Sequence, residues 1–505
     1  MLILPLYLVV KPLKCCYKFV YFFALLVVCL PATGQDAEWS NPEKFRSRTA
    51  FTRILGQNNH GIYVLRSKSR FMGRKVYVQM YKENMGQVFS KLLPGMKKAT
   101  LENAFVYNDG LRLLKSSYNR STHSIDLTAQ AYNLEAEPVG EPVHITSAPQ
   151  RDYADEGDYI VKASLDQTKI LCFHTEISAE KNTIIEIVVM EAATLQERSR
   201  KKIELPHGYG DFTVLNAEVA NNGNAYFIFR VEDDERKKND FERFRYFLYA
   251  YNSTGNSLKD FYLNNTDTYL SRPHLTIDYL NNKIIASGLY SLIDAGFSKG
   301  ILDFGLDINT HTVLYHSFLP YPHDFVGEVI GMRQAENGDE LKDYYIRKVI
   351  PHSDSGYFLL AEEYYVSSQS YTFTINGMVQ VGNRDIYNFG KVLVVSVTKT
   401  GEIEWGKVIN KNQTSSLDLG YYSSFYAMSQ RNKINIFYND ENRGNSEVTL
   451  YTLDANGELD SKLLFKNQTS SISVIPREGQ QLDAITVLFP AAKDRKFAFL
   501  KLLVN

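Results

Sequence analysis

The chain has 505 residues, of which 44% are hydrophobic and 22% are charged, an ordinary composition for a globular protein with a full core. Its formal net charge of −1 excludes the basic field that nucleic acids require, so we expect no nucleic-acid partner. Aromatic residues reach 13%, with 34 Tyr, and half-exposed β-sheets favour such side chains.

Residues 1–34 have the pattern of an export signal. Lys11, Lys14 and Lys18 precede the apolar run 19–30, and small residues follow it. This run is shorter than the ~20 residues that a helix needs to cross a bilayer. We therefore expect a cleaved leader and a mature chain without a stable transmembrane segment, located in the periplasm, at the cell surface or outside the cell. An uncleaved N-terminal anchor is the alternative.

The cysteine positions are compatible with export without disulfides. Cys15, Cys16 and Cys29 lie within the leader, which leaves Cys172 as the cysteine of the mature sequence. Because Cys172 lies in the apolar stretch KILCFH, we interpret it as a small core residue rather than a nucleophile. Stability is then expected to come from packing.

The rest of the chain repeats a unit of two short hairpins. The first hairpin joins an apolar strand through an Asn/Asp turn to a very apolar strand, as in 159–173, 214–229, 274–289 and 425–438. The second hairpin joins a buried strand through a Gly turn to a strand with one polar face. Four strands per unit, without helical periodicity between them, indicate a propeller blade.

The clearest copies of the second hairpin are 395–416 and 450–471. Both copies end in the letters KNQTSS, and their asparagines, Asn412 and Asn467, lie 55 residues apart. Because a period of this length accommodates four strands, it favours a propeller over a solenoid of short coils.

We predict an all-β fold, an eight-bladed β-propeller of four-stranded antiparallel blades, as a single domain over residues 35–505. The last unit stops one strand early, so the segment around 39–45 should supply its outer strand and close the ring. Seven blades are the alternative, because the first hairpin, 49–65, is poorly marked. The predicted units are about 47–96, 97–147, 148–205, 206–263, 264–319, 320–410, 411–465 and 466–505.

Two units carry insertions that we expect to be loops on one face. The sixth unit has extra residues at about 320–342 and 367–390, the second of which is rich in Tyr and Phe. The fourth unit holds the charged segment 232–245, expected as a solvated hairpin or short helix. Insertions in repeat proteins map to one face, which is often the binding face.

The segment 400–405, TGEIEW, resembles the T-G-x-x-x-W segment of pyrroloquinoline-quinone-type (quinoprotein-like) propellers. In that family eight blades are usual, and the Trp docks between neighbouring blades. The resemblance is strong in one unit, because Trp39 and Trp405 are the two tryptophans of the sequence. It implies the fold and not the cofactor, since the vicinal-cysteine disulfide and acidic metal ligands of quinoprotein dehydrogenases are missing. We expect no cofactor.

The sequence contains no established catalytic or metal-binding motif. H-E-x-x-H, C-x-x-C, an acidic EF-hand loop, G-x-S-x-G and a phosphate-binding glycine loop are all missing. His311 and His316 are five residues apart on or beside an outer strand, and we interpret them as surface histidines with hydrogen-bond partners. No metal site is therefore expected.

The best candidate site comes from the loops that join consecutive units, which should share one face and surround the central channel. There Tyr could stack on a ligand while Arg, His or Asp orient it. Such loops are also polar and turn-rich without any ligand. The candidate ligand-binding residues are Tyr153, His207, Tyr209, Asp211, Arg272, His274, Tyr321, His323, Asp324, Asp418 and Tyr421.

Three functional hypotheses follow. The leading one is an exported, non-enzymatic and monomeric propeller that binds a protein or glycan partner through its loop face, with 367–390 needed for capture. The second is a carbohydrate-active hydrolase or lyase with channel-mouth carboxylates such as Asp211 and Asp324, whose separation would decide the mechanism. The third is a scaffold for assembly of the cell envelope.

Overall fold

The computed structural model describes residues 37–44, 52–67, 75–149, 159–233, 240–241, 243–375, 378–416, 418–431, 433–442, 445–465, 472–493 and 496–504. The leader predicted at 1–34 lies outside these ranges, as do Tyr153 and the second KNQTSS copy at 466–471. Within them, no helix combines the length and the apolar character needed to cross a bilayer.

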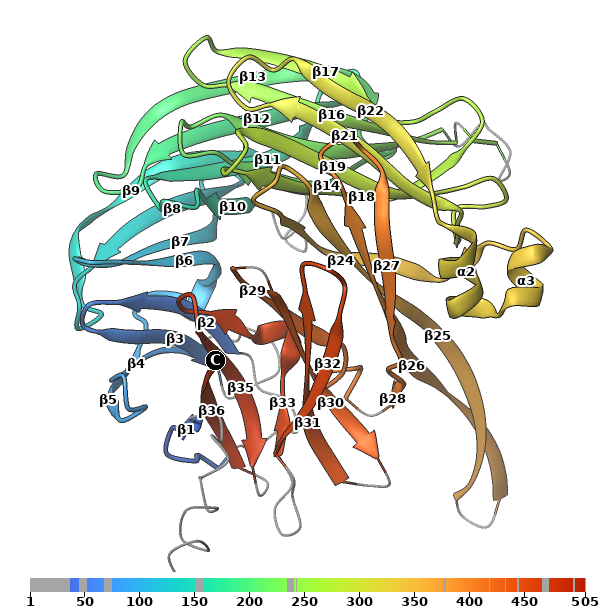
Figure 1. The fold of residues 1–505 in the computed structure, drawn as a ribbon. Coiled ribbons are helices and arrows are strands. Elements are labelled where there is room, and N and C mark those ends of the chain that lie inside the picture. The colour runs from blue at the N-terminus through green and yellow to red at the C-terminus, as the bar shows by residue number, and fades with distance from the viewer. Residues whose placement is uncertain are drawn as a thin grey trace, which may run out of the picture.

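The described strands form nine antiparallel sheets, one of two short strands and eight that follow one another around a ring (Figure 1). Each of these eight sheets contains a path of four adjacent strands, which is the construction of a propeller blade. The eight-bladed prediction is confirmed and the seven-bladed alternative is wrong, because the poorly marked first hairpin belongs to a complete blade.

Blade 1 contains β2 (Thr52–Asn58), β3 (Gly61–Ser67), β4 (Val76–Tyr81) and β5 (Gln87–Leu92), and the 3-10 helix η1 (Met96–Lys98) follows it. Blade 2 contains β6 (Ala99–Tyr107), β7 (Gly110–Asn119), β8 (Ser124–Tyr132) and β9 (Pro138–Pro149). Blade 3 contains β10 (Ile160–Ala163), β11 (Lys169–Ile177), β12 (Asn182–Glu191) and β13 (Gln196–Gly208). Blade 4 contains β14 (Phe212–Val219), β15 (Ala225–Glu232), β16 (Phe244–Asn252) and β17 (Ser257–Tyr262).

Blade 5 contains β18 (Tyr269–Asp278), β19 (Lys283–Ser291), β21 (Gly300–Asp307) and β22 (Val313–Pro320). Blade 6 contains β24 (Tyr344–Pro351), β25 (Tyr357–Ile375), β26 (Met378–Val397) and β27 (Ile403–Ile409), with β28 (Gln413–Ser415) beside β26. Blade 7 contains β29 (Phe425–Gln430), β30 (Lys433–Asn442), β31 (Asn445–Asp454) and β32 (Leu459–Phe465). Blade 8 contains β33 (Ile472–Val474), β35 (Thr486–Lys493), β36 (Lys496–Leu503) and the N-terminal β1 (Ala37–Trp39), with the 3-10 helix η2 (Pro476–Glu478) and β34 (Gln480–Gln481) between β33 and β35.

The ring closes in blade 8, where the first and the last strand of the described chain meet. Strand β1 pairs antiparallel with β36, with Trp39 opposite Leu500. Beyond the strand, the N–H of Ser40 donates to the carbonyl of Phe499 at 3.0 Å. Closure by the N-terminal segment is therefore confirmed, although β1 ends where the predicted segment 39–45 begins. The pairing satisfies backbone groups that an unclosed ring would expose at this seam.

Apolar side chains fill the seams between consecutive blades of the described chain. The seam between blades 6 and 7, for example, joins Phe358 to Ile436, and the closing seam joins Phe499 to Val64. Cys172 lies buried at the seam between blades 2 and 3 and carries a free thiol, which confirms its interpretation as a core residue. Filled seams and closure together hold the ring.

Trp405, the residue that carries the family resemblance, docks across the seam between blades 6 and 7. Its ring lies 5.6 Å from that of Phe358, and it packs on the cluster that joins both blades. It also reaches a turn of blade 7, where Gly457 has a φ of 80°. A Cβ at Gly457 would lie 3.0 Å from the indole, so glycine serves both the turn and the packing.

Both insertions of the sixth unit are ordered elements rather than the expected loops. The first forms α2 (His323–Ile330) and α3 (Met332–Glu336), followed by β23 (Leu341–Lys342), which pairs with β20 (Phe297–Ser298). Helix α2 buries Phe325 against Gly406 of β27, because no side chain at Gly406 opposes it. The second insertion prolongs β25 and β26 into a hairpin that projects from the ring (Figure 1).

The charged segment 232–245 connects β15 and β16 of blade 4. At its described ends the two strands still pair, since the N–H of Asp233 donates to the carbonyl of Arg243 at 2.9 Å. The guanidinium of Arg243 also pairs with Glu232 at 2.9 Å. The described ends therefore fit the solvated hairpin, and residues 234–239 and 242 lie outside the described ranges.

Candidate functional site

One face of the ring carries both insertions and the connections between blades. Neighbouring strands of each blade are antiparallel, so the interblade connections and the turns between second and third strands emerge on the same side. We call this side the loop face. The turns between first and second strands lie on the opposite side.

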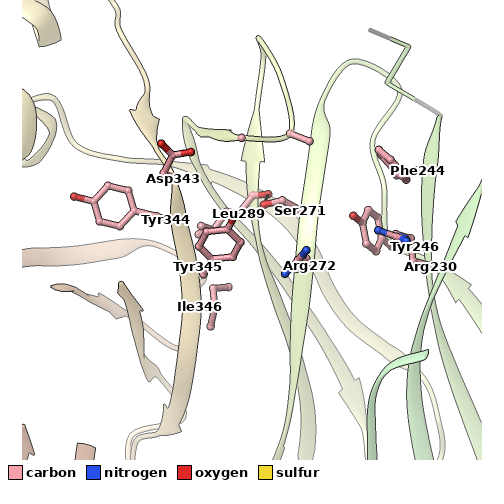
Figure 2. A pocket seen from close by; sticks show the side chains of 12 residues that line it. Arg230, Phe244, Tyr246, Ser271, Arg272, Leu289, Asp343, Tyr344, Tyr345 and Ile346 are labelled. Carbon is pink, nitrogen blue, oxygen red and sulfur yellow. Dashed lines mark hydrogen bonds between the residues drawn. The ribbon is translucent and has the colours of Figure 1, made fainter. Parts of the chain in front are cut away.

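A cavity of about 270 Å³ lies on the loop face between blades 4, 5 and 6 (Figure 2). Its walls come from the ends of β15, β16, β18, β19 and β24, so three blades contribute to it. The side chains on which its chemistry depends are Arg230, Phe244, Tyr246, Arg272, Asp343 and Tyr345.

Arg272 is the sequence-predicted residue that lines this cavity. It lies in a bulge of β18 between Ser271 and His274, and its φ of 32° is unusual for a residue with a side chain. Its guanidinium lies 5.4 Å from the centroid of the Tyr345 ring. Among the residues that the structure describes, no carboxylate forms an ion pair with Arg272. The charge is therefore available to a ligand.

Arg230 approaches the same cavity from β15. Its Nη2 donates to Thr213 Oγ1 at 3.3 Å, and its nearest described carboxylate, Glu232, lies at 4.0 Å. Its guanidinium lies 5.1 Å from the ring centroid of Phe244, and its buried Nε has no hydrogen-bond partner in the described part of the chain. Arg230 therefore keeps donor capacity.

Asn264 holds the aromatic wall of the cavity in position. Its buried side chain accepts a hydrogen bond from the N–H of Tyr246 at 2.7 Å and donates to the carbonyl of Phe244 at 2.9 Å. These bonds fix the first residues of β16, where strand pairing with β17 has not yet begun. Burial raises the pKa of Tyr246, so its phenol stays protonated at neutral pH.

Asp343 contributes a carboxylate to the cavity wall. Its φ of 62° is again unusual for a residue with a side chain. Its N–H donates to the carbonyl of Gly296 at 2.9 Å, and its own carbonyl accepts from the N–H of Tyr364 at 2.8 Å. Because these two bonds hold the backbone, the surrounding loops impose the strained conformation.

His274 follows Arg272 on β18, the innermost strand of blade 5. Burial lowers its pKa to about 4, and the charges of Lys162 and Lys348, on the inner strands of blades 3 and 6, act in the same direction. Lys162 pairs with Glu218 at 3.3 Å, which links the inner strands of blades 3 and 4. The imidazole is therefore neutral at pH 7.

The other predicted residues of blades 3 to 5 do not line the cavity. The His207 ring lies 5.5 Å from that of Phe247 in a tilted arrangement, so packing restricts it, and burial lowers the pKa of His207. Tyr209 is exposed, and the N–H of Asp211 donates to the carbonyl of Gly208 at 3.2 Å in a tight turn. As ligand contacts, these residues stay predictions.

The predicted residues around α2 occupy very different surroundings. Tyr321 is buried, with its hydroxyl 3.1 Å from Ser298 Oγ and its ring against Phe325, so it supports the helix rather than facing solvent. His323 and Asp324 begin α2, and the Asp324 side chain is 98% exposed. The desolvation that prepares a catalytic acid is therefore missing at Asp324.

Asp418 and Tyr421 lie in the connection between blades 6 and 7. The N–H of Tyr421 donates to the carbonyl of Asp418 at 3.1 Å, and the Tyr421 ring meets that of Tyr422 edge-on at 4.9 Å. The described members of the predicted set are thus spread along the loop face, and of these Arg272 alone lines the cavity. Sequence reasoning missed Arg230, Phe244, Tyr246, Asp343 and Tyr345, which lie at strand ends and beside a short strand.

The projecting hairpin is the second feature of the loop face. We call residues 367–375 and 378–386 the ribbon, since they pair with each other and with no third strand of the described chain. Nine pairs, from Ser367 opposite Ile386 to Ile375 opposite Met378, give a length of about 30 Å at ~3.3 Å per residue.

The ribbon exposes apolar and aromatic side chains on both faces. Side chains of Tyr371 and Phe373 stack on one face at 5.6 Å, beside Gly382, whose missing Cβ makes room for both rings. Val379 and Val381 lie on the opposite face and are 72% and 70% exposed. Such a surface is unusual for a protein element that faces only water.

The described chain also brings three potential metal ligands together in blade 3. Single ligand atoms of His174, Glu176 and Glu186 lie within 4.8 Å of one another, because β11 and β12 place His174 opposite Glu186. Lys202 pairs with Glu176 at 2.9 Å, and Arg200 pairs with Glu186. Since the protein's own cations already compensate both carboxylates, we interpret the group as a buried ion network.

The two histidines singled out in the sequence both have partners. His311 is buried rather than at the surface, with its Nε2 3.1 Å from the Tyr226 hydroxyl of blade 4, which corrects the expected exposure. His316 Nε2 lies 3.1 Å from the carbonyl of Leu263. Both contacts reach the preceding blade, so these histidines stabilise a seam.

No family model and no curated protein matches the chain. Among solved structures, it is similar to the WD40 domain of SCAP from fission yeast (8% identity, 93% of this chain and 98% of that one, TM-score 0.41). It is also similar to the quinohemoprotein alcohol dehydrogenase of Comamonas testosteroni (8%, 93% and 76%, 0.42) and the polysaccharide lyase Uly1 (9%, 93% and 99%, 0.36). At such scores these likenesses carry no argument about function. The blades of the chain itself show that it is a β-propeller.

Proposed function

We propose that the chain is an exported, non-enzymatic propeller that binds a protein partner through the ribbon on its loop face. The observation that carries this proposal is the exposure of the ribbon, where Tyr371, Ile375, Met378, Val379 and Val381 are between 45% and 72% exposed. Export is supported by the leader pattern at 1–34, and sequencing of the mature N-terminus would test cleavage after Gly34.

A two-stranded ribbon surrounded by water is marginally stable, because it lacks a third strand and a covered face. Its outer edges also present unpaired backbone groups that can accept another strand. A partner that covers a face of the ribbon or pairs with one of its edges relieves both the exposure of apolar side chains and the lack of backbone partners. A protein partner fits these surfaces better than a glycan, since exposed Val and Met side chains offer few hydrogen bonds to hydroxyl groups.

The ribbon has a firm base from which to act. Strands β25 and β26 continue into the centre of blade 6, where Leu359 and Val395 pair and are fully buried. Phe389 packs under the base of the ribbon against Tyr364 at 4.9 Å. A partner bound to the ribbon is therefore held at a defined position relative to the ring.

The proposal is tested with Val379→Lys/Val381→Lys, which places two charges on one face of the ribbon. We expect the loss of at least ~90% of partner capture from an envelope extract of the source cells, because buried unpaired charges oppose association. A photo-crosslinker at position 379 should then react with the same partner that the wild-type protein captures.

The matched control is Leu165→Lys/Leu280→Lys. These leucines are 72% and 70% exposed, as the two valines are, but they lie in turns on the opposite side of the ring. The control should capture the partner at wild-type level. Equal capture by both double variants, with both folded, would refute the ribbon as the contact surface.

A further inference from the structure

We propose that the cavity between blades 4, 5 and 6 binds a monosaccharide unit that carries a carboxylate or a sulfate group. This inference goes beyond the proposed function, because a sugar can occupy the cavity whether or not a protein covers the ribbon. It stands on four properties of the cavity: its cations, its aromatic walls, its acceptor groups and its size.

The cations of the cavity point to an anionic group on the ligand. Arg230 and Arg272 approach from neighbouring blades, and neither has a close ion pair within the described chain, the nearest carboxylate to Arg230 lying 4.0 Å away. A guanidinium presents parallel N–H donors that match two oxygens of a carboxylate or sulfate. Bound anion oxygens would also satisfy the buried Nε of Arg230, which has no described partner.

The aromatic walls prepare both guanidinium groups for such a ligand. Arg230 lies over Phe244 and Arg272 lies over Tyr345, with cation-to-centroid distances of 5.1 and 5.4 Å. Contact with a ring restricts each guanidinium before binding, which lowers the ordering cost on association. The ring of Tyr246, together with the parts of the Phe244 and Tyr345 rings that the guanidinium groups leave free, offers apolar surface to the C–H groups of a sugar.

The carboxylate of Asp343 favours a sugar over a simple anion as the ligand of the cavity. Its carboxylate shares the cavity with the two arginines and would repel a ligand that is negatively charged throughout. A sugar carries its anionic group at one position and hydroxyl donors at others, so it satisfies the arginines and the aspartate together. Ser271 adds a hydroxyl to the same wall, since its Oγ already donates to the carbonyl of Leu289 at 3.2 Å and can accept.

The volume of the cavity and the backbone conformation of its wall residues fit a ligand with the size of one sugar ring. Its volume of about 270 Å³ lies below the ~300–1,000 Å³ typical of sites for drug-sized ligands. Arg272 and Asp343, on its two sides, hold positive φ values of 32° and 62°. Strained residues persist where the surrounding structure imposes them, and they concentrate at ligand clamps.

The test measures the binding of galacturonic acid, galactose 6-sulfate and neutral galactose by saturation-transfer NMR and calorimetry. We expect binding of at least one acidic sugar and none of galactose at the same concentrations. Arg272→Ala should weaken binding of the acidic sugar at least ~10-fold, and Arg272→Lys should recover little, because lysine lacks the planar fork. Comparison of the two acidic sugars decides between carboxylate and sulfate.

The control is Arg333→Ala, which removes an exposed arginine of α3 on the same face and outside the cavity. It should bind the acidic sugar as the wild type does. Failure of both acidic sugars to bind, equal binding of galactose, or unchanged affinity in Arg272→Ala would overturn the proposal. The ribbon variant Val379→Lys/Val381→Lys should still bind the sugar, so failure of one proposal does not imply failure of the other.

Discussion

Strands β25 and β26 pass through two contrasting environments. At the base of the hairpin, Tyr357–Glu362 and Val392–Val397 are buried at every position, whereas most residues of the ribbon are exposed. Both regions contain Val, Ile and aromatic residues in extended strands. The base lies between β24 and β27 with filled seams on its faces, and the ribbon has no such neighbours in the described chain. The difference teaches that strands of the same composition become core or stay exposed according to what surrounds them.

The boundary between the two environments contains a buried ion pair. Glu362 Oε1 lies 2.9 Å from Lys411 Nζ, and neither side chain is exposed. Arg347 Nε lies 2.9 Å from the other carboxylate oxygen, and Ser424 donates to that oxygen at 2.7 Å. Lys411 begins the first KNQTSS copy and also donates to the carbonyl of Phe389 at 3.1 Å. Lys411 thus connects the base of the projecting hairpin to the segment that follows β27.

The largest expected effect comes from breaking this pair with Lys411→Met. Removing one partner leaves a buried carboxylate with less compensation, which typically costs about 3–5 kcal/mol. The free energy of unfolding in urea should fall by that amount. Lys399→Met, at an exposed turn of the same blade, serves as the control and should change little. A loss below about 1 kcal/mol in Lys411→Met would show that the base does not depend on the pair.

Truncation of one apolar side chain in each environment compares them directly. Leu359→Ala, at the fully buried base, should lower the free energy of unfolding by about 2–5 kcal/mol through lost contacts and a cavity. Val379→Ala, on the ribbon, should change it by less than about 0.5 kcal/mol. Urea denaturation measures both values. Similar losses in the two variants would mean that the ribbon folds as part of the core.

The pH dependence of stability sharpens the comparison further. The pKa of His274 is about 4 in the fold and about 6.5 in an unfolded chain, so the unfolded state takes up a proton first as pH falls. Its contribution is fully present above pH 6.5 and is lost between pH 6.5 and 4. His274→Gln should therefore flatten the melting temperature over that interval, whereas Val379→Lys/Val381→Lys should leave the slope unchanged. An unchanged slope in His274→Gln would contradict this assignment.

Most strands and turns of the ring could be predicted, because short-range patterns in the sequence indicate them. Turns such as the one at Gly401, with a φ of 74°, separate short apolar strands, and the missing strand of the last unit predicts closure near Trp39. Helices α2 and α3 escaped prediction because eight and five residues are too few to show a helical period. The projection of the ribbon also escaped, since a buried strand and an exposed one can share the same residue pattern.

The cavity was the least predictable feature, because its residues meet only through the arrangement of three blades. Arg230 lies near the end of one strand, Arg272 lies at a bulge, and Tyr345 lies near the start of another strand more than 70 residues later. The irregular register at Arg272 has no clear signal in the sequence. Arg272 was predicted because it was assigned to a loop between units. Arg230 and Tyr345 were not predicted, because they lie near the ends of strands.

Closure of the ring sets an order of events during biosynthesis. Trp39 emerges from the ribosome long before its partner Leu500, so their pairing waits until the blades between them have been synthesised. Until then, the early blades expose a seam that only the final strands can cover, and long-range contacts of this kind slow folding. A chaperone that holds the nascent N-terminal segment extended would therefore favour the productive route over pairing between molecules.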